Sequence, residues 1–209
     1  ITRREYDKVK LEMMRLGIVL LAAGAGKRFG GNKLTALVHG KPMYLWAMEN
    51  IEGMKSELPT VVVTGTPEII TAAEAKGMIA VFNGEPELGI SASLRLGIEA
   101  VIQQAGEVDG ILFMVCDQPW LEKTTLVRLM SEFDGGILAL SCGKRRGNPV
   151  IFSKEYLKEL SELSGDVGGR QVMARHREDV RFLEVNDDRE LQDIDTREQM
   201  EIIERQEEI

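Results

Sequence analysis

Short hydrophobic runs alternate along the chain with longer segments in which polar residues dominate. Residues 18–22 and 111–115 are apolar without interruption, which is typical of strands buried on both faces of a parallel sheet. The β-branched run 60–64 also predicts a strand. Further strands are expected at residues 79–83, 137–141 and 180–185.

The segments between these strands predict helices. Pro42 suits the first position of a helix that extends to Met54. Because strands and helices alternate, the sequence predicts an α/β fold with a mainly parallel central sheet and helices on both faces. In such sheets, ligands bind beyond the carboxyl ends of the strands. Other helices are expected at residues 68–76, 91–102, 123–133, 155–163, after residue 170 and through most of 190–208.

The length of 209 residues suits one globular domain with a substantial core. Residues 1–16 are highly charged and are interpreted as an N-terminal extension, which leaves residues 17–209 as the domain. No repeat, low-complexity segment or linker divides this region, so no further domain boundary is predicted.

Composition and charge argue against several classes of protein. The formal net charge of −8 disfavours binding to nucleic acid or to an anionic membrane. No apolar run approaches the roughly 18 residues that a membrane span requires, and the first residues are too polar for a secretory signal. Because Cys116 and Cys142 suggest neither a disulfide framework nor a zinc site, a reducing cytoplasm is expected.

A basic, glycine-rich segment directly follows the first predicted strand. It interleaves glycines with cations: Gly24, Gly26, Lys27, Arg28, Gly30, Gly31 and Lys33. Glycines let successive backbone N–H groups converge on an anion, and neighbouring cations can clamp it. The segment fits neither the Walker sequence nor the G-x-G-x-x-G dinucleotide fingerprint. It therefore predicts a polyphosphate site of a different kind.

Residues 21–33 read Leu-Ala-Ala-Gly-x-Gly-x-Arg-Phe-Gly-x-x-Lys. This pattern resembles the signature of the nucleotidyltransferases with the MobA-like, GT-A-type fold, which transfer NMP from an NTP. Together with Cys-Asp-Gln-Pro at 116–119 and Gly-Asp-x-Gly-x-Arg at 165–170, it is most similar to the molybdenum cofactor cytidylyltransferases. The resemblance covers nearly the whole chain after Leu16 and implies a three-layer αβα, Rossmann-like fold.

The resemblance implies that CMP is transferred from CTP to a molybdopterin cofactor, with release of pyrophosphate and with Mg²⁺ as cofactor. It also implies a partner, an apo molybdenum hydroxylase that receives the product. Three different functions stay open at this point. The enzyme could use another NTP, as a guanylyltransferase does, or another acceptor, such as a sugar phosphate or an isoprenoid precursor. The protein could also be a non-catalytic cofactor-binding chaperone for the hydroxylase.

The first strand and the glycine-rich segment supply most of the expected nucleotide contacts. Arg28 and Lys33 are expected to clamp the triphosphate and to act in catalysis, whereas Lys27 is expected to face solvent. By resemblance, Gly89 and Ser93 lie near the nucleotide, although Ser93 could instead cap a helix. Backbone contacts to the phosphates or to the base are expected from Leu21, Ala22, Ala23, Gly24, Ala25 and Gly26.

The expected acceptor site also follows from the resemblance, which places Asn148, Pro149, Asp166 and Arg170 there. Lys144, Arg145 and Arg146 could meet an anionic acceptor, but three adjacent cations are more often an exposed turn. Arg170 is therefore the one cation assigned to the acceptor.

Two aspartates are the expected metal ligands, because a hard cation such as Mg²⁺ prefers carboxylates together with phosphates and water. Asp117 follows an apolar strand, where it is suited either to a site at the strand end or to a turn or helix cap. Asp195 precedes a charged helix, and Thr196 to Gln199 fit a capping box. Asp195 rather than Asp193 is assigned to the metal.

Overall fold

The structure is a computed structural model that describes residues 15–24, 29–52, 54 and 59–206. Its centre is a seven-stranded sheet with the order β5-β4-β1-β6-β8-β7-β9. All neighbouring pairs are parallel except those of β8, which runs antiparallel to β6 and β7. The strands are β1 (Leu16–Ala22), β4 (Thr60–Thr64), β5 (Ile79–Phe82), β6 (Gly110–Val115), β7 (Ile137–Cys142), β8 (Arg145–Ser153) and β9 (Val180–Glu184).

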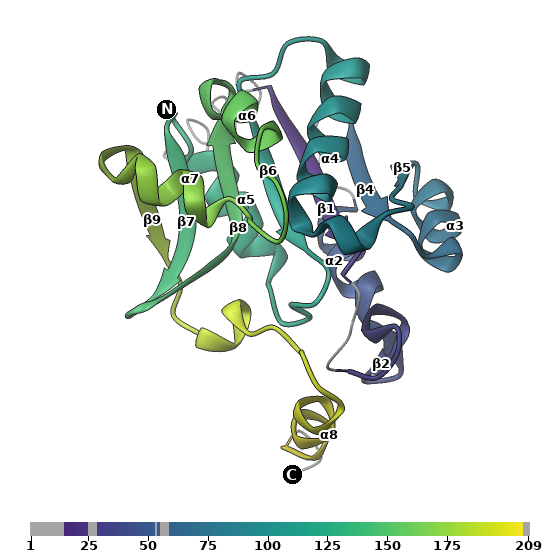
Figure 1. The fold of residues 1–209 in the computed structure, drawn as a ribbon. Helices are drawn as coiled ribbons and strands as arrows, with labels where there is room; N and C mark the ends of the chain where they lie inside the picture. The colour runs from purple at the N-terminus through teal and green to yellow at the C-terminus, as the bar shows by residue number, and fades with distance from the viewer. Residues whose placement is uncertain (1–14, 25–28, 53, 55–58, 207–209) are drawn as a thin grey trace.

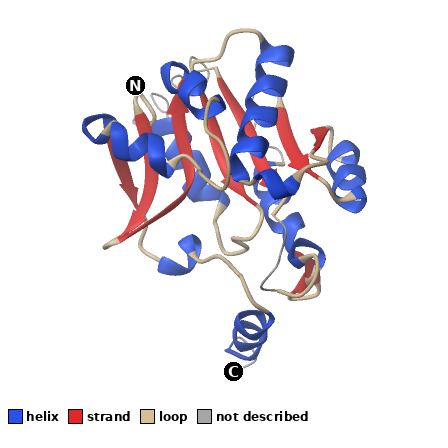
Figure 2. Cartoon of the chain, viewed as in Figure 1, coloured by secondary structure: helices blue, strands red, loops and turns tan. Residues whose placement is uncertain are grey.

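Helices cover both faces of this sheet (Figures 1 and 2). One face packs against α2 (Met43–Ile51), α3 (Pro67–Ala75) and α5 (Lys123–Glu132). The other packs against α4 (Ile90–Ala105), α6 (Lys154–Ser161) and α7 (Arg170–Arg175). The predicted three-layer αβα architecture with a mainly parallel sheet is therefore confirmed. None of the described helices is both long enough and apolar enough to cross a membrane.

The smaller elements lie mostly in the connections between the strands and helices. A two-stranded ladder that the sequence did not predict joins β2 (Leu37–Val38) to β3 (Lys41–Pro42). Four short 3₁₀ helices are η1 (Lys33–Thr35), η2 (Pro86–Leu88), η3 (Arg177–Asp179) and η4 (Asp188–Leu191). The last helix is α8 (Arg197–Gln206).

Strand β1 lies inside the sheet because its side chains are apolar on both faces. It pairs with β4 on one side and with β6 on the other. Ile18 and Leu20 are fully buried in the core under α2 and α5. Val19 is fully buried in the opposite core, under α4. The uninterrupted apolar run thus forms a strand buried on both faces, as the sequence predicted.

The structure corrects one prediction in the second half of the chain. The basic turn expected at residues 143–147 is shorter, because β8 already begins at Arg145. The β7–β8 register shifts between Ala139 and Leu140, which leaves Asn148 and Pro149 outside the regular ladder. The charged C-terminal helix begins at Arg197, directly after residues 193–196, which the sequence places before it. The short η4, capped by the Asp187 side chain, was not predicted.

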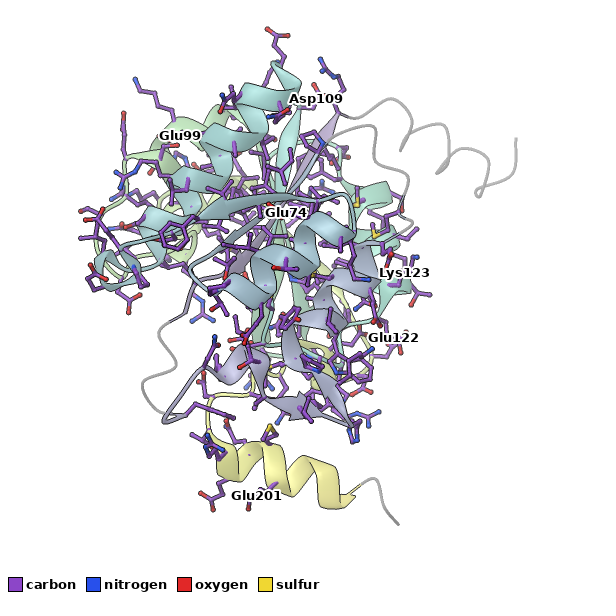
Figure 3. The ribbon with its side chains drawn as sticks, turned by 90° about the vertical axis from the view of Figure 1, so that its right-hand side faces the viewer. Glu74, Glu99, Asp109, Glu122, Lys123 and Glu201 are labelled. Atoms are coloured by element: carbon purple, nitrogen blue, oxygen red, sulfur yellow. The ribbon has the colours of Figure 1, made fainter. Side chains whose placement is uncertain are left out.

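The predicted N-terminal extension falls almost wholly outside the described residues. Leu16, which was assigned to it, is the first residue of β1. The Arg15 backbone N–H donates to Asp109 Oδ2 at 2.8 Å. Figure 3 shows Asp109, just before β6, at one end of the molecule and α8, with Glu201, at the other. The carboxyl ends of β1 and β6 therefore face the end of the molecule where α8 lies.

Helix α4 begins where two loops come into close contact. Gly89, the residue before the helix, has φ +86° and ψ −178°. A Cβ atom at this position would lie 2.5 Å from the carbonyl carbon of Gly165. The Ser91 hydroxyl donates to the Gly165 carbonyl at 2.7 Å. The glycine therefore allows the loop at residues 165–166 to lie directly on the start of α4.

Gly89→Ala should lower the free energy of unfolding by about 3 kcal/mol, because the new Cβ would meet both a disfavoured φ and the Gly165 backbone. Urea denaturation followed by circular dichroism measures this. Gly77→Ala is the matched control, since Gly77 has φ +72° with open space around it. This variant should lower the free energy of unfolding by only about 1 kcal/mol. Equal losses in the two variants would show that the Gly165 backbone does not obstruct a Cβ at position 89.

Candidate functional site

Lys33 lies between two carboxylates beyond the ends of β1 and β6. Its Nζ is 2.6 Å from Asp117 Oδ2 and 3.0 Å from Asp195 Oδ1. Lys33 is only 9% exposed, so the contacts form in a largely water-excluded position. The three residues come from separate segments, 84 and 162 positions apart from Lys33. The fold therefore brings together three charged residues that the sequence analysis assigned to the site.

Local hydrogen bonds hold Lys33 in this position. The preceding Asn32 accepts a bond from the Leu34 backbone N–H through its side-chain oxygen, at 3.2 Å. The Asn32 Nδ2 donates to the Thr66 hydroxyl at 2.8 Å. Leu34 itself is buried in the core. Asn32 and Leu34 thus fix the first turn of η1, and Lys33 between them points to the aspartates.

Asp195 is held by the start of α8. The Gln199 Oε1 accepts bonds from the backbone N–H groups of Asp195 and Thr196, at 2.7 and 3.0 Å. The Thr196 hydroxyl accepts from the Gln199 N–H at 3.2 Å, so the predicted capping box is confirmed. In addition, the Ile194 N–H donates to the Asp117 carbonyl at 3.0 Å. The cap and this backbone contact place Asp195 against Lys33.

The neighbouring Asp193 has a different environment. Its Oδ1 accepts a hydrogen bond from Gln118 Nε2 at 2.8 Å. Burial, reinforced by the nearby charge of Asp117, raises the pKa of Asp193 above its usual range. Asp193 does not line the cavity that contains Asp117 and Asp195. Of the two aspartates, only Asp195 lines this cavity, and its assignment to a metal stays a prediction.

The site leaves one carboxylate oxygen without a hydrogen bond. Asp117 Oδ1 is buried and has no partner among the described residues, and the same holds for Gln118 Oε1. Such a buried, unpaired acceptor is costly unless a ligand binds it.

Burial works to lower the pKa of Lys33, but the two carboxylates outweigh it and raise that pKa above the ordinary value. Burial, together with Asp117, also raises the pKa of the Cys116 thiol, so this cysteine stays protonated in the core.

A cavity of about 560 Å³ opens around this cluster, and we call it the acidic cavity. Among the described residues that line it, Lys33 is the only cation, whereas four residues carry carboxylates: Glu87, Asp117, Asp166 and Asp195. An anionic ligand therefore needs additional cations to bind here. The remaining lining residues are Leu21, Ala23, Gly24, Leu34, Pro86, Gly89, Ile90, Ser93, Val115 and Cys116.

The structure excludes the helix-capping role that the sequence left open for Ser93 and for Asp117. Ser93 does not cap α4, because the residue before that helix is Gly89 and its start has no side-chain cap. Instead the Ser93 hydroxyl accepts a bond from Asn83 Nδ2 at 3.0 Å. Asp117 is not a helix cap either, since α5 begins only after Glu122. Both residues line the acidic cavity.

Some predicted site residues are not brought to a cavity. Ala22 is buried, and its carbonyl accepts the Thr64 hydroxyl at 2.9 Å. Pro149 is buried in the irregular part of β8. Neither lines a cavity that the structure describes. The assignments to Ala25, Gly26 and Arg28 lie outside the described residues.

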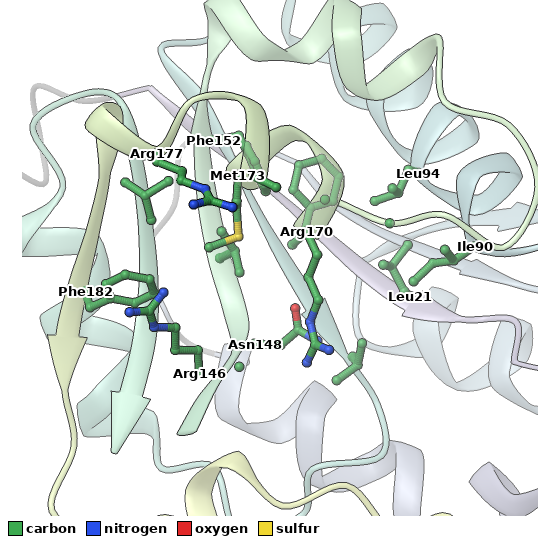
Figure 4. A pocket seen from close by; sticks show the side chains of 18 of the residues that line it. Leu21, Ile90, Leu94, Arg146, Asn148, Phe152, Arg170, Met173, Arg177 and Phe182 are labelled. Atoms are coloured by element: carbon green, nitrogen blue, oxygen red, sulfur yellow. The ribbon is translucent and has the colours of Figure 1, made fainter. Parts of the chain in front are cut away.

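A larger cavity of about 1070 Å³ adjoins the acidic one and shares Leu21, Ile90 and Val115 with it (Figure 4). We call it the basic cavity, because its lining contains four cations and, among the described residues, no carboxylate. The cations are Lys144, Arg146, Arg170 and Arg177. Two predicted acceptor residues, Asn148 and Arg170, line this cavity, whereas Asp166 lines the acidic one.

Sequence analysis missed one wall of the basic cavity. The Arg146 guanidinium lies over the Phe182 ring, 4.3 Å from its centroid. These side chains come from β8 and β9, which lie on either side of β7. The sequence holds a signal for Arg146, since three consecutive cations in an acidic chain are unusual, but such a run more often forms an exposed turn. Nothing in the local sequence pointed to Phe182.

Comparison with known proteins identifies the family. Residues 18–180, well over half of the chain, match the MobA-like NTP transferase domain. Among curated proteins, nicotine blue oxidoreductase of Paenarthrobacter nicotinovorans is 29% identical over 193 residues, covering 87% of this chain and 93% of that protein. The name of that protein describes an oxidation–reduction reaction rather than the transfer of a nucleotide.

Solved structures share the fold at low sequence identity. The Rv0371c protein of Mycobacterium tuberculosis H37Rv has a TM-score of 0.77 at 24% identity, covering 92% of this chain and 98% of that one. It has also been solved in complex with manganese. CMP:2-keto-3-deoxy-manno-octonic acid synthetase, solved with CTP, has a TM-score of 0.70 at 15% identity, covering 93% of this chain and 98% of that one. With the fold of GT-A-type nucleotidyltransferases and a family match across residues 18–180, the chain belongs to the MobA-like NTP transferase family and is a nucleotidyltransferase.

Proposed function

We propose that the protein is a molybdenum cofactor cytidylyltransferase, which transfers CMP from CTP to the phosphate of a molybdopterin cofactor in the presence of Mg²⁺. One observation carries the proposal. The Asp117–Lys33–Asp195 cluster lies in an acidic cavity that adjoins a larger basic cavity. A metal-bound nucleotide suits the first, and a phosphate-bearing acceptor suits the second.

The reaction requires the two substrates to meet between the cavities. An oxygen of the acceptor phosphate attacks the α-phosphorus of CTP. The bond from this phosphorus to the oxygen that bridges to the β-phosphate breaks, and pyrophosphate leaves with that oxygen and its electron pair. Because a phosphate is already ionised at neutral pH, no strong protein base is needed. Positioning and charge neutralisation supply the catalysis.

The residues around β1 would position CTP. Ala23 and Gly24 line the acidic cavity directly after the strand, where backbone groups can approach the phosphates without obstruction by large side chains. The Lys33 ammonium would donate to triphosphate oxygens, and Arg28 stays a predicted second clamp. The choice of CTP over another NTP rests on the Ala-Ala-Gly sequence at residues 22–24 and on its resemblance to the cytidylyltransferases.

The donor set fits a magnesium ion. Asp117 and Asp195 offer only oxygen donors, and Asp117 Oδ1 is buried with no partner among the described residues. One or two carboxylates, completed by phosphates and water, are the usual ligands of Mg²⁺. When bound, the metal would neutralise charge on the triphosphate in this acidic cavity. A partly exposed group at His176, Glu178 and Asp179 also has ligand atoms within 4.8 Å of one another, but it does not line the acidic cavity.

The basic cavity supports a large acceptor over a small one. A volume of about 1070 Å³ is at the upper end of what drug-sized ligands occupy. Its walls include Phe152, Met173 and Phe182, and aromatic or sulfur-containing side chains cover flat rings better than they bind sugar hydroxyls. Molybdopterin combines a ring system with a phosphate. A sugar phosphate would leave much of the apolar wall uncovered.

A panel of NTPs and acceptors tests the proposal, with pyrophosphate release as the measurement. CTP with molybdopterin should give the highest turnover. Turnover with GTP, or with a sugar phosphate or isoprenoid precursor and not with molybdopterin, would replace the proposed substrates. Electron transfer to a dye without pyrophosphate release would favour the chemistry named for nicotine blue oxidoreductase. Cofactor delivery to an apo-hydroxylase without turnover would favour a chaperone.

Asp117→Asn should reduce kcat by about 10³-fold, because it removes a charged metal ligand that would stabilise the transition state by several kcal/mol. Pyrophosphate release with CTP, Mg²⁺ and molybdopterin measures the loss, and circular dichroism checks the fold. Asp188→Asn removes an exposed carboxylate outside both cavities and should retain activity. Wild-type turnover in Asp117→Asn would eliminate the proposed role of this carboxylate.

Lys33→Met should tighten Mn²⁺ binding by the nucleotide-free protein by about tenfold or more, because it leaves the two carboxylates without their ammonium partner. It should also slow nucleotidyl transfer, since the same ammonium would contact the triphosphate. Titration by electron paramagnetic resonance measures the affinity. Lys41→Met breaks a Lys41–Glu49 pair elsewhere and serves as control. Unchanged or weaker Mn²⁺ binding in Lys33→Met would argue against a metal at these aspartates.

A further inference from the structure

We infer that the acceptor carries a second anionic group on a flat ring system, and that Arg146 and Phe182 select it at the far end of the basic cavity. The identity of the acceptor rests on the proposed function. The ring-binding end of the cavity does not rest on the proposed function, because it is inferred from the side chains that line the cavity.

The charge of the basic cavity exceeds what one phosphate requires. Four cations line it, with no carboxylate among the described lining residues, although the chain as a whole carries a net charge of −8. Lys144, Arg170 and Arg177 form no ion pair with any residue that the structure describes. Four like charges lining one cavity repel one another, although solvent screens these exposed side chains. A ligand with more than one anionic group would relieve the repulsion that remains.

The cations occupy two different parts of the cavity (Figure 4). Arg170, from the start of α7, extends to Asn148, on the side where Leu21 and Ile90 adjoin the acidic cavity. This position suits the phosphate that receives the nucleotide. Arg146 lies on the other side, over Phe182, and Arg177 lies on that side beside Met173. A second anionic group of the acceptor would bind there.

The Arg146–Phe182 pair provides a preformed surface for a ring. The guanidinium lies 4.3 Å from the centroid of the Phe182 ring, so the aromatic side chain holds it by a cation–π contact. A guanidinium held over one ring can stack a second planar group on its opposite face and still donate from its edge to an anion. Val180 and Met173 complete an apolar wall around it. The pair therefore favours a planar anion over a sugar.

Binding of pterin-6-carboxylate tests this without any turnover. This fluorescent probe is planar and anionic and lacks a phosphate, so it reports on the ring-binding end alone. It should bind the wild-type protein, and Arg146→Met and Phe182→Ala should each weaken binding at least tenfold. The matched control is Arg145→Met, which removes the same charge from a neighbouring side chain that does not line the cavity. It should change the affinity less than twofold.

Thermal unfolding of each variant excludes misfolding as the cause of lost binding. Absence of probe binding by the wild-type protein would overturn the inference. Equal weakening in Arg145→Met and Arg146→Met would also overturn it, because the effect would then be one of general charge. The probe should remain bound when CTP is added, since the nucleotide would occupy the acidic cavity.

Steady-state kinetics distinguish this inference from the proposed function. With molybdopterin and CTP, Arg146→Met should raise the KM for molybdopterin at least tenfold and leave kcat and the KM for CTP within about twofold. A comparable change in the KM for CTP would contradict a role restricted to the acceptor. Probe binding without pyrophosphate release would reject the proposed function and retain the ring site. Pyrophosphate release without probe binding would reject the ring site and retain the proposed function.

Discussion

The contact of Lys33 with Asp117 and Asp195 is the interaction around which the carboxyl end of the sheet is arranged. Two carboxylates this close together in a largely buried place repel each other, and the ammonium between them offsets that repulsion. Each partner is fixed by its own segment: η1 holds Lys33, β6 leads to Asp117, and the cap of α8 holds Asp195. The site therefore depends on three connections forming together.

The two adjoining cavities differ in charge, and this difference would suit the two anionic substrates of the proposed reaction. The acidic cavity has one described cation and four carboxylates, so a triphosphate would enter it together with a divalent metal. The basic cavity has four cations among its described lining residues and could bind an anion without a metal. Leu21, Ile90 and Val115 belong to both linings, so the reacting phosphates can meet where β1 and β6 end.

Most of the fold was predictable because buried segments require apolar residues, which can be recognised in the sequence. Residues 18–22 and 111–115 had to be strands buried on both faces, since no polar side chain interrupts them. The start of β8 was not predictable, because Arg145 and Arg146 read as a turn, and they join the ladder only by pairing with Cys142 and Ser141. The start of α8 was predictable, because the capping box at Thr196 marks it, whereas the short η4 before it was not.

The sequence by itself determined the family resemblance, the strand-end position of Asp117 and the capping box at Thr196, because each depends on neighbouring residues in the chain. Only the tertiary structure decided that Lys33 contacts both aspartates, and that Arg146 meets Phe182 to form a wall of the basic cavity. Such contacts depend on strand order and register, which are set by packing across the whole sheet and leave no local signal.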